Sequence, residues 1–282
     1  MSCPTDWPEG SERDRRLEPR KVAEMRKRHG PQFDLAERVL TAATRMGLDE
    51  HPRHASGDAA VPKVLLAIYG KMVYVYWGLI VLAERSLPTS ALIRELMESF
   101  VSLAYITNGE TVERARLFRD SVALQASRHL QKRLKDEDSR ESVRPSDLAF
   151  AEELARRVRE SRTTDEIDAM MKWRTWSGLS VEAMLRAAGL STFLYRGPYA
   201  AESESLHGFD AFGYFNWLEG GGLELVPRDL VNLHLIPAAT LLVSAMILLH
   251  DHLGFDRRED TVRLFEAVLV FNRLRARGET EE

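Results

Sequence analysis

The chain has 282 residues, of which 44% are apolar and 29% are charged, and its formal net charge is -4 at pH 7. This length fits one large domain or one domain with an appended segment, and the apolar content is sufficient for a core, which excludes a wholly disordered chain. The small net charge gives no overall attraction to nucleic acid or anionic lipid, so binding to either would need a local basic patch.

The N-terminal region is polar and basic. Between Arg13 and Arg28 eight basic residues accompany three acidic ones, and residues 1–31 contain four prolines and two glycines. We predict that residues 1–60 form a mobile basic arm plus one short helix, at about 34–46. The first thirty residues lack the apolar core of a secretory signal, and the single cysteine, Cys3, excludes intramolecular disulfides. We therefore expect a cytoplasmic protein.

Residues 64–83 form the most apolar stretch, and Lys71 is its only charged residue. Its length could cross a bilayer. However, a lysine at mid-span is costly there, and the flanks have neither an aromatic belt nor a one-sided basic cluster. We therefore predict no stable membrane insertion. An all-round apolar helix in a soluble chain is typically the centre of a bundle, which we place at about 62–84.

The remaining sequence is dominated by helical periodicity. Thr163 and Glu166 have capping-box spacing, which places a helix start there. No convincing alternation of a strand, no βαβ spacing and no internal repeat is present. We predict an all-α protein, an irregular multi-helix bundle with one helical domain at 61–275 and a disordered tail at 276–282. The predicted helices, besides the two above, are 88–107, 111–134, 146–161, 164–172, 180–188, 235–249 and 260–275.

The segment 198–226 differs from its surroundings. It contains five acidic residues and six aromatic residues but no lysine or arginine, and it includes a triplet of glycines at 220–222. No Gly-Lys-Ser/Thr follows these glycines, so they do not form a phosphate loop. A long segment of this composition is typical of a loop that covers or binds something.

Several short motifs were tested for chemistry. Glu204 and His207 have the Glu-x-x-His spacing of di-iron bundles, but only one such pair is present. His250-Asp251 resembles the doublet of HD-type metal phosphohydrolases, but Asp256 and Asp260, which follow it, lie too near to be the helix-spaced final ligand. A capping or solvated helix end is the simpler interpretation of that doublet.

Two segments match the arginine-histidine spacing of HEPN-class ribonucleases, Arg45 to His51 and Arg228 to His234. In that class a cation and an acid-base group meet at a helix start. This bare spacing arises easily by chance in a chain rich in arginine. In a regular helix the ends of the second match would point about 120° apart, which disfavours a shared site unless a loop or Pro237 rearranges them.

Several motifs follow one another along the chain, namely Arg94-Glu-Leu-Met-Glu98, Ala104-Tyr105, Phe118, Trp176-Ser-Gly-Leu-Ser180, Gly189-Leu, Tyr195-Arg196 and Ser203-Glu-Ser-Leu-His207-Gly208. Their order resembles a bacterial all-helical family known as a domain of unknown function, over about 61–246. The resemblance implies that an Arg94/Glu98 pair faces the segment with Tyr195, Ser203 and His207, in a bundle distantly like HEPN proteins. Extra residues between Tyr195 and Ser203 depart from the pattern.

From these observations we derive one main functional hypothesis. It is a metal-independent RNA endonuclease of a bacterial toxin or phage-defence system, without a cofactor, in which the general acid/base is His207, the phosphate is held by Arg94 and both are oriented by Glu98. Further substrate contacts are assigned to Tyr195, Arg196, Ser203 and Arg228.

Other interpretations stay open. The chain could be a non-catalytic helical module that binds a protein partner or a nucleotide-like ligand through 198–226. A third hypothesis is metal-dependent hydrolysis through Glu98, Glu204 and His207. Arg94 and Glu98 could instead be an ordinary surface pair, and His207 could simply end a helix before Gly208. The expected partners are RNA or a protein, with a homodimer as one option.

Overall fold

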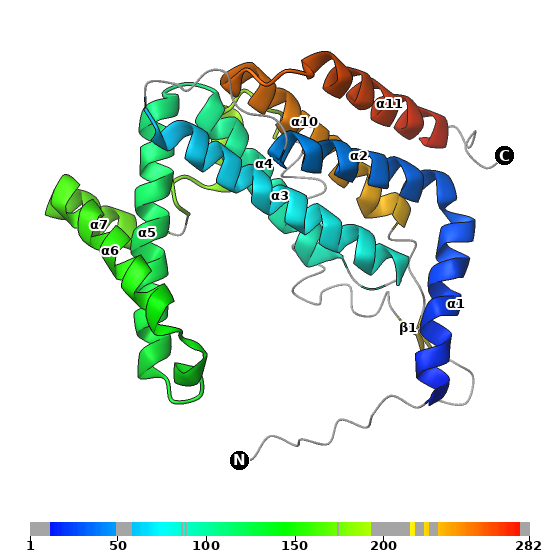
Figure 1. Ribbon diagram of the computed structural model, residues 1–282, viewed down its shortest axis with the longest axis horizontal. Helices are drawn as coiled ribbons and strands as arrows, with labels where there is room; N and C mark the ends of the chain where they lie inside the picture. Colours follow the sequence, from blue (N-terminus) through cyan, green and yellow to red (C-terminus); the bar gives the residue numbers. More distant parts are fainter. Residues whose placement is uncertain are drawn as a thin grey trace.

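The computed structural model describes residues 12–48, 58–85, 87, 89–173, 175–192, 215–217, 223–225 and 231–276. Within these ranges the chain is a bundle of α-helices, which confirms the all-α prediction (Figure 1). The elements are α1 (Glu12–Arg28), α2 (Gly30–Leu48), α3 (Ala60–Glu84), α4 (Ser90–Thr107), α5 (Thr111–Lys135), η1 (Arg140–Ser142), α6 (Pro145–Ser161), α7 (Thr164–Lys172), α8 (Val181–Ala187), β1 (Phe215–Trp217), β2 (Leu223–Leu225), η4 (Val231–Leu235), α10 (Ile236–Leu253) and α11 (Arg258–Ala276).

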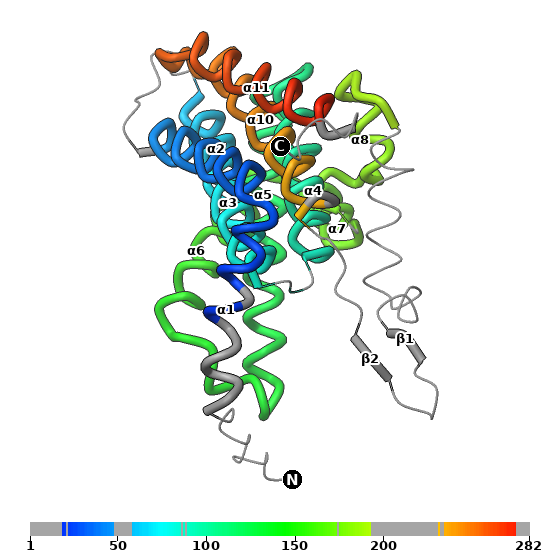
Figure 2. The backbone as a smooth tube through the Cα atoms, turned by 90° about the vertical axis from the view of Figure 1, so that its right-hand side faces the viewer, coloured from blue at the N-terminus to red at the C-terminus, as the bar shows by residue number. Residues whose placement is uncertain are grey.

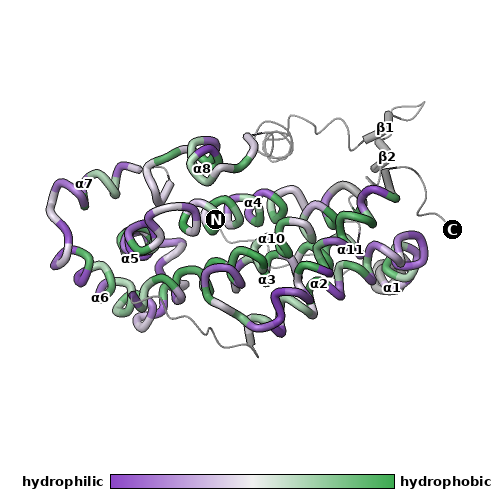
Figure 3. The backbone as a smooth tube through the Cα atoms, turned by 90° about the horizontal axis from the view of Figure 1, so that it is seen from above, coloured by the Kyte–Doolittle hydropathy of each residue, from purple (hydrophilic) through white to green (hydrophobic). Residues whose placement is uncertain are grey.

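Helix α3 lies at the centre of the bundle, as predicted for about 62–84. It packs against α2, α4, α5 and α10, and both α3 and α10 are apolar along most of their length (Figure 3). Tyr69, Met72 and Tyr76 are completely buried in this core. The Tyr69 hydroxyl donates to the carbonyl oxygen of Ala43 at 2.8 Å, which ties α3 to α2. Because α3 has neighbours on several sides, it is apolar on several sides.

Helix α2 belongs to this same core. Its side chains Phe33, Val39 and Met46 are fully buried among residues of α3 and α10. Helix α2 lies before the predicted division at residue 60, and α3 and α10 lie after it.

The basic segment before α2, which we predict as part of a mobile arm, is helical. Helix α1 spans 12–28 and includes Pro19. Near its C-terminal end, Arg26 forms ion pairs with Glu37 of α2 at 2.5 Å and with Glu84 of α3. These two pairs attach the end of α1 to the bundle, a tertiary contact that local composition cannot indicate.

The second half of α5, with α6 and α7, projects from the main bundle (Figure 1). This projection has its own small core, which contains Leu124, Ala155, Val158 and Met170. The predicted capping box at the start of α7 is confirmed, since the Glu166 amide donates to Thr163 Oγ1 and the Thr163 amide donates to Glu166 Oε2. The boundaries of α7 agree with the prediction because this signal is local.

Strands β1 and β2 pair antiparallel, with Phe215 opposite Leu225, Asn216 opposite Glu224 and Trp217 opposite Leu223. This short hairpin lies within the segment 198–226. No strand was predicted, because three residues per strand are too few for alternation to be recognised.

Two helices, α3 and α10, are long and apolar enough to cross a membrane by length and composition. Of the most apolar part of each, 50% and 61% respectively is buried inside the protein. Core helices of soluble proteins satisfy the same criterion, so this finding is weak evidence for a membrane span.

Candidate functional site

The candidate site begins on α4, whose two faces have different surroundings. Arg94 and Glu98 lie one turn apart at the edge of the buried face, with Arg94 Nε 3.1 Å from Glu98 Oε1. Their side chains are 29% and 44% exposed. The carboxylate therefore orients a guanidinium that solvent can reach. The buried face of α4 contains Ile93, Leu96, Met97 and Phe100.

The polar edge of α4 continues toward its C-terminal end. The Ser102 hydroxyl donates to the carbonyl oxygen of Glu98 at 2.9 Å and accepts a hydrogen bond from the Trp176 indole at 3.0 Å. The Trp176 ring also contacts the rings of Tyr105 and Phe118, at centroid distances of 5.7 and 5.0 Å. These contacts hold the segment before α8 against α4 and α5.

The C-terminal end of α4 is held by Arg114 and Asn108. Arg114 Nη1 donates to the carbonyl oxygens of Tyr105 and Asn108, each at 2.5 Å, and its guanidinium lies 4.0 Å from the centre of the Tyr105 ring. Asn108 Nδ2 donates to the carbonyl oxygen of Ala188 at 2.5 Å. Helix α8 consequently lies beside α4 (Figure 2). The segment that contains the other predicted site residues follows α8 in the chain, so it begins beside α4.

Of the seven predicted site residues, the structure describes Arg94 and Glu98 and brings them together. The predicted contact between Arg94 and the His207 imidazole involves a residue outside the described ranges. The other five, Tyr195, Arg196, Ser203, His207 and Arg228, lie outside the described residues.

His234, the histidine of the second arginine-histidine match, was not among the predicted site residues. It lies in η4, a π-helical turn directly before α10. Its side chain is buried, and Nδ1 is 2.5 Å from the Oγ1 of Thr89. Since Thr89 immediately precedes α4, the turn places His234 at the N-terminal end of the helix that carries Arg94. The spacing from Arg228 was visible in the sequence, but the π-helical backbone was not.

The other tested motif, His250-Asp251, is structural. Both ring nitrogens of His250 are engaged, Nδ1 with the carbonyl oxygen of Phe255 at 3.2 Å and Nε2 with Thr261 Oγ1 at 2.9 Å. Asp251 forms an ion pair with Arg258 at 2.6 Å. Among the described residues, no group of three histidine, cysteine, aspartate or glutamate side chains could hold a metal ion.

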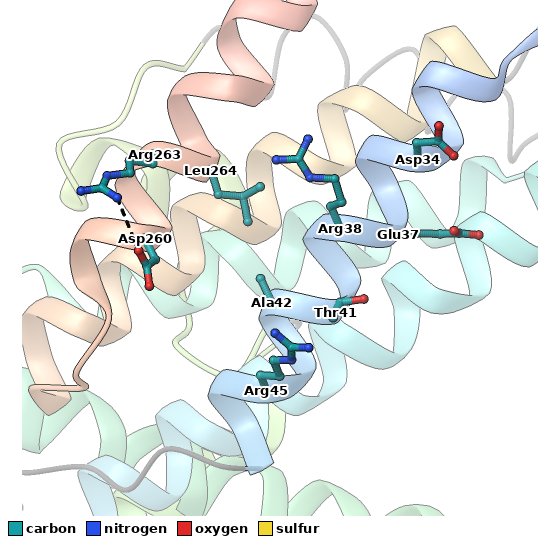
Figure 4. Close-up of a pocket in the computed structure, with 9 residues that line it drawn as sticks. All are labelled: Asp34, Glu37, Arg38, Thr41, Ala42, Arg45, Asp260, Arg263 and Leu264. Atoms are coloured by element: carbon teal, nitrogen blue, oxygen red, sulfur yellow. Dashed lines mark ion pairs between the residues drawn. The ribbon is translucent and has the colours of Figure 1, made fainter.

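Two hollows lined by described residues were not predicted, because helices far apart in the chain line each of them. One of about 410 Å³ lies between α4 and α10 and is lined by residues that include Phe100, Thr107 and His252. Burial lowers the pKa of His252, against the opposing charge of Asp251. The other, of about 690 Å³, lies between α2 and α11 (Figure 4).

These features define an all-α bundle with an oriented arginine-glutamate pair at the edge of its fourth helix. Residues 63–223 match a family of unknown function, DUF5677. This match covers more than half of the chain, which therefore belongs to that family. It contains Arg94, Glu98 and His207, whereas Arg228 lies beyond its end. No curated protein and no solved structure matches the chain.

Proposed function

We propose that the protein is a metal-independent RNA endonuclease in which Arg94 binds the scissile phosphate, Glu98 orients Arg94 and His207 is the general acid/base. The observation that supports this proposal is the Arg94–Glu98 pair, a guanidinium held by a carboxylate at 3.1 Å yet 29% exposed. A fixed guanidinium is a good ligand for phosphate oxygens, because its donors match their geometry.

The proposed reaction is an internal transesterification of RNA. A base removes the proton of the ribose 2′-hydroxyl, whose oxygen forms a bond to phosphorus while the bond from phosphorus to the 5′-oxygen breaks. The leaving 5′-oxygen receives a proton from the conjugate acid. The products are a 2′,3′-cyclic phosphate and a 5′-hydroxyl. Arg94 stabilises the charge that develops on the phosphate oxygens, so no metal is needed for this step.

The test is cleavage of total RNA by the purified protein in the presence of a metal chelator. We expect His207→Ala and Arg94→Ala to reduce cleavage by about 10²-fold or more, which is the usual contribution of an acid-base group. Arg186→Ala is the matched control, because Arg186 is exposed and forms an i,i+4 pair with Glu182 on α8 at 2.9 Å. Equal cleavage by wild type and His207→Ala, or none by wild type, would contradict the proposal.

Product ends provide a second readout. We expect 2′,3′-cyclic phosphate and 5′-hydroxyl termini, and the finding of 3′-hydroxyl and 5′-phosphate ends would instead indicate attack by water. A role in a toxin or phage-defence system further requires that induced expression in a bacterial host arrests growth. The His207→Ala protein should not arrest it.

A second candidate function is a binding module that uses 198–226. The β1–β2 hairpin favours it, because part of this aromatic, acidic segment has paired backbone. Deletion of residues 209–217 should then abolish capture of a defined partner in a pull-down. If every partner remained bound, this candidate would be discarded.

A further inference from the structure

The groove between α2 and α11 has the properties of a binding site. Its volume of about 690 Å³ is within the range of small-molecule sites, roughly 300–1,000 Å³. Ala42 of α2 and Leu264 of α11 give it a partly buried apolar surface. Its remaining lining residues are polar or charged, namely Asp34, Glu37, Arg38, Thr41, Arg45, Asp260 and Arg263.

Two arginines of α2, Arg38 and Arg45, supply positive charge to this groove. Arg38 and Arg45 are seven positions apart, which places them on the same side of the helix about 10 Å apart along its axis. Both are exposed, and neither forms an ion pair with any residue that the structure describes. Figure 4 shows Arg38 extended toward Leu264, across the space between the two helices.

The carboxylates of the lining are largely engaged elsewhere. Glu37 forms an ion pair with Arg26 at 2.5 Å, and in Figure 4 it extends to the side of α2 away from α11. Asp260 is 4.0 Å from Arg263 on its own helix. Asp34 is the remaining acid in this lining. Glu37 and Asp260 are thus paired with other arginines, which leaves Asp34, four positions before Arg38, as the one acid of the lining without an ion pair to a described residue. The guanidinium groups of Arg38 and Arg45 outnumber this carboxylate.

We propose that this groove binds a nucleoside triphosphate, with Arg38 and Arg45 on neighbouring phosphates and the base against Leu264 and Ala42. Two guanidiniums two helical turns apart suit a ligand with several anionic groups in a row better than a single carboxylate. The apolar surface beside them suits a flat ring. Both walls lie outside residues 63–223, so the site belongs to the parts of this chain beyond the family match.

Calorimetric titration of the purified full chain with ATP at low ionic strength tests this proposal. We expect saturable binding that the double variant Arg38→Gln/Arg45→Gln weakens at least tenfold. The matched control is Arg144→Gln/Arg159→Gln, which removes the same charge from exposed arginines of the α6 region. This control should bind ATP like wild type. Arg263→Gln, on the opposite wall, is a second and milder variant and should also weaken binding.

Several outcomes would overturn the site. Absence of ATP binding to the wild type, or an equal loss in the control variant, would remove it. Inorganic phosphate that bound as tightly as ATP would show that no base is recognised. If a single-stranded RNA oligonucleotide bound through Arg38 and Arg45 and ATP did not bind, the ligand of this groove would be a nucleic-acid strand and not a nucleotide. The nuclease proposal is tested by RNA cleavage with the Arg94→Ala variant, and the groove is tested by ATP binding with the Arg38 and Arg45 variants. The failure of one proposal therefore does not imply failure of the other.

Discussion

At the scale of single residues, two tyrosines of α3 illustrate how position decides the role of a side chain. Tyr74 is 70% exposed and contacts Trp77, with ring centroids 5.9 Å apart. Tyr76, two residues later, is fully buried, and its hydroxyl has no hydrogen-bond partner among the described residues. A buried hydroxyl that has lost its water without gaining a partner opposes folding.

We therefore expect Tyr76→Phe to raise the free energy of unfolding by about 1–3 kcal/mol, the typical penalty for an unsatisfied buried group. Urea unfolding at pH 7 measures this change. Tyr74→Phe is the control and should leave stability unchanged, since its hydroxyl already reaches water. A lower stability for Tyr76→Phe would show that the hydroxyl makes a favourable interaction.

Tyr76 also has a consequence at high pH. Burial raises the pKa of its phenol above that of the unfolded chain, which is near 10. The unfavourable effect of this hydroxyl on stability is constant below pH 10 and grows as the pH rises above this value, because only the unfolded chain releases the proton. Wild type should thus lose more stability than Tyr76→Phe between pH 9 and pH 11.

At the scale of elements, predictions succeeded where the determining signal is local. The start of α7 followed from Thr163 and Glu166, two residues three positions apart. By contrast, the helical structure of α1 and the π-helical turn η4 were missed. Helix α1 is joined to other helices by ion pairs of Arg26. The turn η4 contains His234, which contacts Thr89 more than a hundred positions away in the chain. Such contacts have no signature in the residues of the element itself.

The capping box supplies a prediction for α7. Thr163→Ala removes the side chain that accepts from the Glu166 amide at 3.3 Å, and we expect it to cost about 1 kcal/mol of stability. Thr164→Ala, at the next position, is the control, because no capping bond involves it. Hydrogen bonds from the Thr163 amide and hydroxyl lower the pKa of Glu166 from 4.5. The effect of Thr163→Ala should therefore persist above pH 4.5 and decrease as the pH falls through the lower, folded-state pKa. An undiminished effect at pH 2 would contradict this account.

At the scale of the whole molecule, the spacing of residues in the sequence predicted one feature, the Arg94–Glu98 pair, and did not predict another, the groove between α2 and α11. The i,i+4 spacing of Arg94 and Glu98 predicted that they could pair, because a helix places such residues on one side. The groove at Arg38 and Arg45 was not predicted, since it requires knowledge that α11 lies near α2. Sequence patterns therefore identify pairs within one helix, whereas the walls of a hollow depend on how the helices pack.

The same scale governs how the projection of α5, α6 and α7 is attached. Asp120 of α5 is buried, and its carboxylate binds Arg162 at 3.0 Å and Arg119 at 2.7 Å. Arg162 lies between α6 and α7, and it also contacts Glu113 of α5 and Glu166 at 3.3 Å. Burial lowers the pKa of Arg162, but the hydrogen bond and charge of Asp120 outweigh it, and the pKa is raised overall. One buried carboxylate thus joins three helices.

Asp120→Ala should consequently be destabilising, because it leaves a partly buried guanidinium without its closest partner. We expect a loss of about 1–3 kcal/mol, the typical cost of removing one partner of a buried polar group, because Arg162 keeps Glu113 and Glu166. Asp147→Ala is the control, since Asp147 forms an exposed pair with Arg144 and should change stability by less than about 1 kcal/mol. Hydrogen exchange locates the effect: in Asp120→Ala, amides of α6 and α7 should exchange faster while those of α3 and α10 stay protected, because the projection has its own small core. Uniform loss of protection would show that the projection and the main bundle unfold as one unit.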